Sequence, residues 1–308
     1  MNPTHNERSG LIDPWGAIAC AAAAMLFAAK GIFAKQLYAL GLGSEGVVAI
    51  RAIIALPLFW WFALRREHWQ EITQTPRSAV FMAAMAGALC YYIGALLDFL
   101  ALTMIDASVE RVLIFSYPAM VVIFTSVRDR RWPPVSIQVA TALAYLGIFF
   151  TMGGFDLVEL RANVFGALLV IGSALSYAIY FLVSEKYTRS IGSARFTLIA
   201  MTTATACLAP HYFLRHGTTE IVVIEPVGWL LLVGIAVFCM FVPASLQAEG
   251  VRRIGAQRGS VMSTVGPPTT VLLAFFLLGE RLSAWQWLGM VLIVLGILVL
   301  DLARTRNR

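Results

Sequence analysis

Two adjacent charges, Glu110 and Arg111, stand at the head of the apolar run "VLIFSYPAMVVIF". Four further ionisable residues lie inside other apolar runs of the chain: Lys30, Lys35, Arg51 and Asp98. If these runs cross a membrane, a charge near the centre of the bilayer costs about 2.5–3.5 kcal/mol and usually faces protein, water or a bound solute. These side chains are therefore the first candidates for binding a charged ligand.

Lys30 has the strongest reason to have a partner. Ten residues separate it from the end of its apolar run, about 15 Å along a helix, so an unpaired ammonium group there would be costly. The partner is expected to be Glu110, Asp98 or a carboxylate of a bound substrate. For Lys35 and Arg111 the alternative is that the side chains extend to the lipid headgroups, and Glu110 could instead cap the first turn of its helix.

Tyrosine hydroxyls form a second polar set inside the apolar runs, at Tyr91, Tyr92, Tyr117, Tyr177 and Tyr180. Residues 177 and 180 are three apart and share one helical face. Buried tyrosine hydroxyls need hydrogen-bond partners, so these side chains either join helices or line a cavity with polar tips and stacking faces. The predicted substrate-binding set combines charges and tyrosines: Lys30, Arg51, Tyr92, Glu110, Arg111, Tyr177 and Tyr180.

Asp98 and Glu110 are the acids well inside the runs, so both are candidates for proton coupling. Burial favours the protonated form of a carboxylate, whereas a neighbouring cation favours the ionised form. Arg111 adjoins Glu110 in sequence and would hold it ionised. Asp98 is therefore the better candidate for a proton carrier.

Motifs for metal, nucleotide or covalent chemistry are missing from the sequence. The four cysteines lie inside apolar runs, the four histidines lie in loops or at the ends of runs, and neither CxxC, HExxH nor GxxxxGK[ST] occurs. We therefore expect no catalytic residues, no metal site and no cofactor.

The composition predicts the elements that must position these residues. The 308 residues are 59% hydrophobic and only 13% charged, and the apolar residues fall in runs of about 20, the length of a helix that crosses a bilayer. The sequence thus predicts an all-α polytopic membrane protein with ten transmembrane helices. The expected spans are 14–40, 45–64, 78–103, 105–127, 133–152, 162–184, 196–214, 227–248, 257–279 and 284–302.

The distribution of basic residues predicts the orientation. If the N-terminus is cytoplasmic, the inner segments hold sixteen lysines and arginines and the outer segments hold three. This is a strong positive-inside pattern, so both termini are expected in the cytoplasm, with the chain in the inner membrane of a bacterium. The net charge of +6 then reports orientation, and no nucleic-acid partner is expected.

Similarity between the two halves of the chain predicts an internal repeat, with residues 1–155 as the first unit and 156–308 as the second. At an offset of 149 residues Ile105 meets Ile254, Pro118 meets Pro267 and Gly147 meets Gly296. Five spans per unit make the repeats inverted, which is the usual architecture of secondary transporters that bind substrate near the membrane midplane. On this topology the six charges lie in the outer half of the first repeat, and all but Lys35 have uncharged equivalents in the second.

Three prolines are expected to kink their helices: Pro118, Pro243 and Pro267. A proline removes one backbone hydrogen bond, so such kinks either allow bending around a central site or serve static packing. Gly289 and Gly296 share one face of the last span and predict a close-packed seam, against another span or another protomer.

The segment "GVRRIGAQRGSVMSTVGPPTTVLLAFFLLGERLSAWQWLGMVLIVLGILVL" at 250–300 resembles the second repeat of an EamA-type carrier of the drug/metabolite transporter superfamily. The likeness lies in the small residues opening the ninth span, its mid-helix proline, the "LLGERLSAWQWLG" turn and the glycine spacing of the tenth span. "LTMIDASVERVLIFSYPAMVVIF" at 102–124 resembles the first-repeat counterpart, although "RDRRW" at 128–132 lacks the glutamate of "GER". The resemblance implies transport of small metabolites such as amino acids, often as efflux.

The sequence therefore predicts a secondary transporter that exports a small metabolite, such as an amino acid or related organic solute, by alternating access between its two repeats. Three cations against two anions in the set Lys30, Arg51, Asp98, Glu110 and Arg111 favour a solute with a carboxylate. The alternatives are a membrane-embedded enzyme acting on lipid and a passive channel for small solutes. The expected partners are a small-molecule substrate and the lipid bilayer, and the protein is expected to be a monomer or a homodimer.

Overall fold

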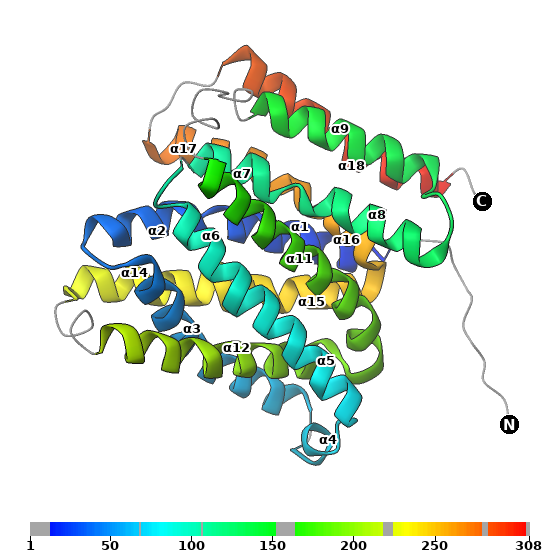
Figure 1. Cartoon of the computed structure of the whole chain (residues 1–308). Helices are drawn as coiled ribbons and strands as arrows, with labels where there is room; N and C mark the ends of the chain where they lie inside the picture. The colour runs from blue at the N-terminus through cyan, green and yellow to red at the C-terminus, as the bar shows by residue number, and fades with distance from the viewer. Residues whose placement is uncertain are drawn as a thin grey trace, which may run out of the picture.

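The structure is a computed structural model that describes residues 13–67, 69–105, 107–151, 164–217, 224–278 and 283–305. Over these residues the chain forms helices and turns without a strand (Figure 1). The "GER" turn at 279–281 and the proposed boundary between the repeats at residue 155 lie outside the described residues.

Over its described residues, the first half of the chain forms five long helical stretches and one short helix, and three of the long stretches are interrupted. Their helices are α1 (Pro14–Ala28), α2 (Lys30–Ala39), α3 (Ser44–Arg66), the short α4 (Trp69–Thr73), α5 (Arg77–Gly87), the π-helix η1 (Ala88–Gly94), α6 (Ala95–Ala101), α7 (Ala107–Ile114), α8 (Tyr117–Asp129) and α9 (Val135–Thr151).

The second half repeats this order with different interruptions. Its helices are α11 (Val164–Ile191), α12 (Ser193–His216), α14 (Pro226–Ala236), the π-helix η2 (Val237–Phe241), α15 (Val242–Ile254), α16 (Ala256–Met262), the 3₁₀ turn η3 (Ser263–Val265), α17 (Gly266–Leu278) and α18 (Ala284–Thr305).

The described part of the chain has five helical stretches that are long and apolar enough to cross a membrane: Pro14–Ala39, Ser44–Arg66, Arg77–Ala101, Val164–Ile191 and Pro226–Ile254. Two shorter apolar helices cover Val135–Thr151 and Ala284–Val299. The remaining predicted spans are also helical: α7 with α8, α16 with α17, and α12. The chain is therefore an all-α polytopic membrane protein, as the composition predicts.

Close contacts of glycines reproduce the relation between the two halves. A Cβ atom on Gly16, at the start of α1, would lie 2.7 Å from Cγ2 of Ile254. The equivalent Gly166, at the start of α11, approaches Ile105 in the same way, with 2.9 Å between such a Cβ atom and Cγ2 of the isoleucine. Because α1 and α11 begin at opposite ends of the bundle, the two contacts are inverted copies of each other (Figure 1).

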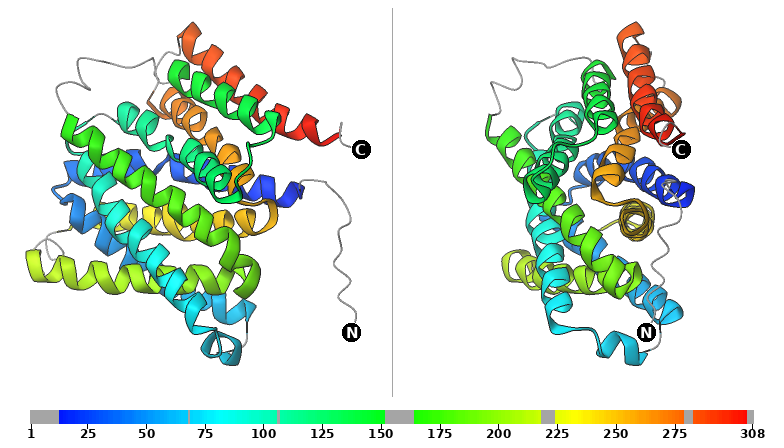
Figure 2. Two further views of the ribbon diagram at one scale, coloured as in Figure 1. Left: turned by 45° about the vertical axis from the view of Figure 1, so that its right-hand side comes forward. Right: turned by 90° about the vertical axis from the view of Figure 1, so that its right-hand side faces the viewer.

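Helices α9 and α18 form a pair along one side of the bundle (Figure 2). A Cβ atom on Gly147 would lie 2.7 Å from the carbonyl oxygen of Gly289, and one on Gly296 would lie 2.9 Å from that of Ala140. The seam predicted at Gly289 and Gly296 thus packs against another helix of the same chain. Glycine is required here because the two backbones approach each other directly.

The three prolines follow interruptions of their helices. Pro118 is the second residue of α8, after the turn at Phe115 and Ser116, and Pro267 is the second residue of α17, after the 3₁₀ turn η3. Pro243 is the second residue of α15 and follows the π-helix η2. At this position a proline is tolerated, because the first residues of a helix have no intrahelical partner for their N–H groups.

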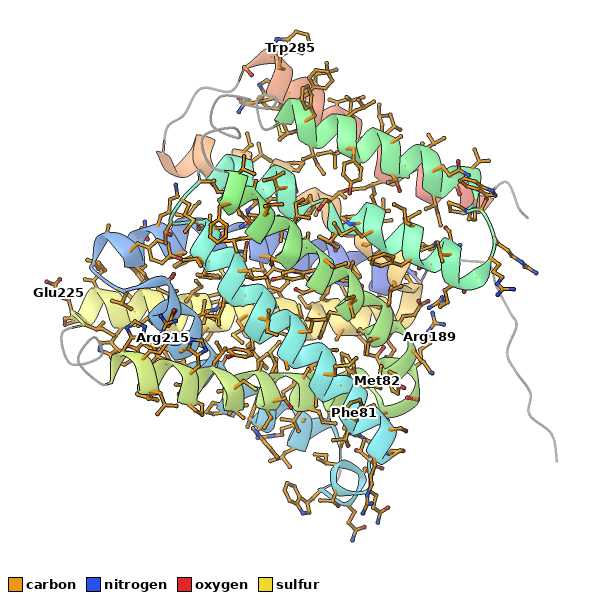
Figure 3. The ribbon with its side chains drawn as sticks, in the orientation of Figure 1. Phe81, Met82, Arg189, Arg215, Glu225 and Trp285 are labelled. Carbon is orange, nitrogen blue, oxygen red and sulfur yellow. The ribbon has the colours of Figure 1, made fainter. Side chains whose placement is uncertain are left out.

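Basic side chains gather where α1 begins and α15 ends, which we call the basic end of the bundle. Figure 3 shows Arg189 at this end and Arg215 with Glu225 at the opposite end. Arg253 at the end of α15 donates to Asp13, which caps α1, with 2.7 Å between Nη1 and Oδ2. This hydrogen bond holds the pKa of Asp13 below its usual value, so the bond is present in the ionised form at neutral pH.

Candidate functional site

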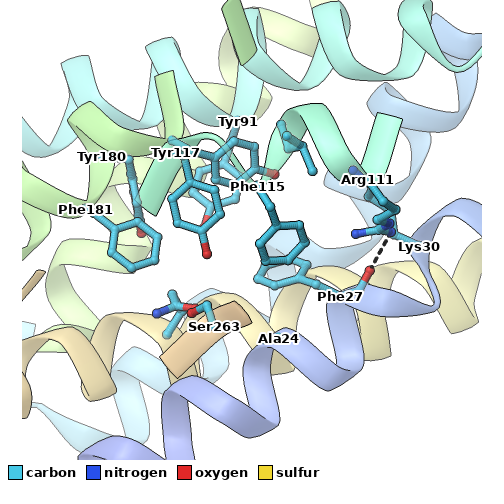
Figure 4. Close-up of a pocket in the computed structure, with 13 residues that line it drawn as sticks. Ala24, Phe27, Lys30, Tyr91, Arg111, Phe115, Tyr117, Tyr180, Phe181 and Ser263 are labelled. Carbon is cyan, nitrogen blue, oxygen red and sulfur yellow. Dashed lines mark hydrogen bonds between the residues drawn. The ribbon is translucent and has the colours of Figure 1, made fainter. Parts of the chain in front are cut away.

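The first span is interrupted at Ala29, where α1 ends and α2 begins, without a proline or glycine at that residue. Arg111 of α7 explains the interruption, because its Nη2 atom donates to the carbonyl oxygens of Phe27 at 3.1 Å and of Ala28 at 3.4 Å (Figure 4). A side chain that enters the hydrogen-bond ladder of a helix is a recognised cause of a kink. The equivalent helix α11 runs without a break.

Lys30 begins α2 directly after this interruption. Its ammonium group donates to Asp98 Oδ2 of α6, and Glu110 Oε1 of α7 lies 3.8 Å from Nζ. Glu110 Oε2 lies 3.5 Å from Nε of Arg111. Three separate helices thus bring together two cations and two anions. The ammonium group of Lys30, deep in its span, has carboxylate groups as its partners.

All of these charges are removed from solvent. The exposed fraction is 5% for Lys30, 1% for Asp98, 0% for Glu110 and 4% for Arg111. The alternative that Arg111 extends to the headgroups is therefore wrong, and Glu110 faces this cluster rather than capping its helix. Lys35, by contrast, has an exposed side chain on α2.

Arg51 of α3 adds a third cation, which is 5% exposed. Its guanidinium carbon lies 4.3 Å from the ring centroid of Phe99, which Lys30 Nζ also approaches at 5.4 Å. Among the described residues no ion pair of Arg51 is found, and its Nε atom is buried without a hydrogen-bond partner. The cluster Lys30, Arg51, Asp98, Glu110 and Arg111, which we call the charge cluster, therefore carries one more cation than anions.

A small cavity lies beside the charge cluster (Figure 4). Its volume is about 50 Å³, which holds about three to five water molecules at roughly 10–15 Å³ each. Lys30 and Arg111 contribute the cationic part of the wall, and Gln247 of α15 and Ser263 of η3 contribute neutral polar groups. The remaining lining is aromatic or aliphatic: Ala24, Phe27, Tyr91, Ile114, Phe115, Tyr117, Tyr177, Tyr180 and Phe181.

The aromatic side chains of the cavity contact one another across the two halves of the chain. Tyr91 of η1 meets Tyr180 of α11 edge to face, with 5.1 Å between ring centroids. Tyr117 of α8 lies 5.2 Å from Phe181 and 6.0 Å from Tyr177 by the same measure. The hydroxyl of Tyr180 is buried in this wall, where Tyr91 is its polar neighbour.

Tyr92, predicted for the binding set, lies outside this cavity. Its hydroxyl pairs with Nδ1 of His211 in α12 at 2.9 Å. His211 and His216 both approach Glu45 of α3, with 3.5 Å and 2.9 Å from their Nε2 atoms to Oε2. In the described part of the chain no group of His, Cys, Asp or Glu side chains is arranged to hold a metal ion.

The structure thus divides the predicted binding residues into three groups. Lys30, Arg111, Tyr177 and Tyr180 line the cavity. Arg51 and Glu110 belong to the charge cluster, with Asp98, but do not line the cavity. Tyr92 forms the third group, outside the cavity and the charge cluster, where its hydroxyl pairs with His211. Four polar residues that line the cavity are missing from the predicted binding set: Tyr91, Tyr117, Gln247 and Ser263. The sequence offers one signal for Gln247, which occupies the position equivalent to Asp98 in the second repeat.

Comparison with known proteins identifies the family. The profile of the EamA-like transporter family matches residues 14–153 and again residues 164–301. The chain belongs to the EamA-like transporter family. The uncharacterized transporter YcbK of Bacillus subtilis is 33% identical over 267 residues, which cover 85% of each chain. An uncharacterized transporter of Archaeoglobus fulgidus is 26% identical over 194 residues, 63% of this chain and 67% of that protein.

A solved structure, described only as "Crystal structure of protein", shares the fold of this EamA-like chain. It superposes with a TM-score of 0.77 over 95% of this chain and 98% of its own, at 17% sequence identity. This likeness concerns the fold alone. Family and relatives together make the protein a multi-pass membrane transporter.

Proposed function

We propose that this EamA-like protein is a secondary transporter that exports a small metabolite with a carboxylate group, such as an amino acid. The observation that carries the proposal is the excess of one cation in the buried charge cluster beside a cavity with aromatic walls. A carboxylate from the substrate would neutralise that excess. Buried charges are stable when they are paired, so the cluster favours an anionic group as its partner.

The cavity suggests how such a solute would be held. Its carboxylate would face Lys30 and Arg111, its body would lie between Tyr117 and Tyr180, and a polar end would reach Gln247. Sites for small molecules commonly measure about 300–1,000 Å³. The cavity of about 50 Å³ is smaller, so the aromatic side chains must move apart before a metabolite enters.

Alternating access would provide that opening. The interruptions at Ala29, before Pro118 and before Pro267 lie around the cavity, where broken helices bind substrate in transporters with inverted repeats. Bending at these points would open one face of the bundle and close the other. Each half of the chain contributes to both the cavity walls and the interruptions.

We propose Glu110 rather than Asp98 as the proton-coupling residue, and the contacts within the charge cluster support this choice. Asp98 accepts a hydrogen bond from Lys30, which favours its ionised form. The cations nearest to the oxygens of Glu110 lie 3.8 Å and 3.5 Å away, too far for the direct hydrogen bond that Asp98 accepts, so this carboxylate gains less from being ionised. The sequence alone favours the opposite roles, because it shows Arg111 next to Glu110 and cannot show Lys30 beside Asp98.

We further place the protein in the inner membrane with both termini in the cytoplasm. The basic end of the bundle would then face the cytoplasm, in keeping with the positive-inside rule. Export would carry the substrate from this end toward the end that holds Glu45. Protons that enter from the end that holds Glu45 and leave at the basic end would drive this export.

A ligand screen by thermal stability tests the binding part of the proposal. Purified protein is heated with amino acids and other carboxylates, each matched with its uncharged amide. A ligand that binds the folded state raises the apparent stability by mass action, by about 2.7 kcal/mol at 100 times its dissociation constant. We expect at least one acid to stabilise the protein and its amide to have no effect. Equal stabilisation by acid and amide would remove the carboxylate from the proposal.

A further inference from the structure

A second hollow lies away from the charge cluster, between the end of α8 and the start of α9. Its volume is about 500 Å³, and we call it the basic groove. Val122, Ile123 and Val127 of α8 form its apolar side, and Arg130, Arg131 and Trp132 of the turn form its polar rim. It is far larger than the central cavity and shares none of its residues.

The two arginines of the rim are available to a ligand. Both side chains are exposed, and among the described residues neither forms an ion pair. Asp129, the neighbouring acid in sequence, already accepts from Arg128 through both carboxylate oxygens, at 2.8 Å and 3.4 Å. Asp129 is therefore paired with Arg128, and its charge acts on Arg131 without an ion pair between the two.

The backbone fixes these arginines at the mouth of the groove. Arg130 has a φ of 50°, in the left-handed region that non-glycine residues seldom adopt. The N–H groups of Arg130 and Arg131 donate to the carbonyl oxygens of Val127 at 3.3 Å and Ser126 at 3.2 Å. These bonds end α8 in a tight turn, so two consecutive arginines stand on a rigid support beside the apolar side of α8.

The apolar side of the groove has the chemistry of a lipid tail site. The exposed fractions of Ile123 and Val127 are 57% and 73%, and that of Trp132 is 90%. In a membrane protein such side chains face lipid, and tryptophan prefers the level of the headgroups. An apolar strip that ends in tryptophan and two arginines matches an acyl chain that ends in a phosphate.

We propose that the basic groove binds an anionic phospholipid. The phosphate group would accept hydrogen bonds from Arg130 and Arg131, and one acyl chain would lie along Val122, Ile123 and Val127. Charge complementarity selects an anionic lipid over a zwitterionic one, since basic pockets between transmembrane helices attract anionic headgroups. This site is separate from transport substrate binding, and its test does not depend on the proposed function.

Binding of phosphatidylglycerol to the purified protein, followed by mass spectrometry of the intact complex, tests the site. Arg130→Gln/Arg131→Gln is expected to weaken binding about 25-fold, about fivefold for each arginine near an anionic headgroup. Phosphatidylcholine binding should not change. Val127→Trp fills the groove without altering its charge and should also weaken binding of phosphatidylglycerol. This variant tests the site independently if the double arginine variant fails to fold.

Arg65→Gln/Arg66→Gln is the matched control, because it removes the same charge at the basic end. These arginines stack on Trp61 and Phe62, at 5.7 Å and 5.2 Å to the ring centroids, outside the groove. The control should keep the wild-type affinity. If lipid binding weakens equally in both double arginine variants, general surface charge explains the effect and the groove is not a specific site. Unchanged lipid binding in the groove variants would also contradict the proposed site. Displacement of the lipid by inorganic phosphate at millimolar concentration would make it a phosphate site instead.

Discussion

The ammonium group of Lys30 donates a hydrogen bond to the carboxylate of Asp98, although 68 residues separate the two in sequence. Lys30 opens α2 after the break in the first span, and Asp98 lies in α6 after a π-helix. Two irregular helices therefore meet at one ion pair. Arg111 and Glu110 extend the pair into the charge cluster beside the cavity.

Removing only one partner of this pair should destabilise the protein. Lys30→Gln leaves Asp98 and Glu110 without their shared cation, and breaking a buried ion pair in this way costs about 3–5 kcal/mol. The double variant Lys30→Gln/Asp98→Asn removes both charges and should recover most of that loss. Thermal unfolding of the purified variants measures both effects. Losses that simply add in the double variant would mean that the pair contributes no coupling energy.

Glu110→Gln should separate exchange from accumulation. In proteoliposomes the variant is expected to exchange substrate across the membrane but to lose accumulation driven by a pH gradient, because its side chain no longer binds and releases a proton. Asp98→Asn should impair both activities, since it removes the partner of Lys30. If accumulation survives in Glu110→Gln and is lost selectively in Asp98→Asn, the two roles are reversed.

Much of the fold is predictable because its cause is local. Runs of about 20 apolar residues indicate spans, and Pro118 and Pro267 mark interruptions because proline lacks an N–H group. The break at Ala29 has no such local cause. It depends on Arg111, which is distant in sequence and reaches the carbonyl groups of α1 only in the folded chain.

One tyrosine of the predicted binding set, Tyr92, lies outside the cavity for a related reason. Tyr177 and Tyr180 lie in a regular helix, where a spacing of three residues does place both side chains on the face that lines the cavity. Tyr91 and Tyr92 lie in the π-helix η1, whose wider turn changes which residue faces inward. Regular helical spacing therefore could not select Tyr91 over Tyr92.

Gly87→Ala should destabilise the contact between the two halves of the chain. A Cβ atom at this position would lie 2.2 Å from the carbonyl oxygen of Ala200 in α12, so the backbones must separate, at a cost of about 1–3 kcal/mol. Gly172→Ala is the control, because its Cβ atom would meet only Cδ1 of Leu97 at 3.3 Å. Thermal unfolding should show a loss for the first variant alone. Equal losses in the two variants would contradict the packing explanation, since only Gly87 approaches a backbone atom so closely.

Cysteine labelling tests the inverted topology. The four native cysteines are replaced first, and single cysteines then enter as Leu157→Cys, Thr218→Cys or Ser190→Cys. An impermeant thiol reagent added to spheroplasts should label positions 157 and 218, which follow outward-running spans in the proposed orientation. Position 190, at the basic end, should react only after lysis. Labelling of position 190 in intact spheroplasts would contradict the orientation.

Counterflow in proteoliposomes tests whether the protein is a carrier that binds a carboxylate at Lys30. Vesicles loaded with an unlabelled acid found in the thermal screen are diluted into a trace of the labelled acid. We expect a transient accumulation of label above equilibrium in the wild type, since only a carrier exchanges bound solutes in this way. Lys30→Gln/Asp98→Asn, if folded, should show none. Uptake that rises only to equilibrium in the wild type would indicate a channel, and an unchanged overshoot in the double variant would remove Lys30 from the binding site.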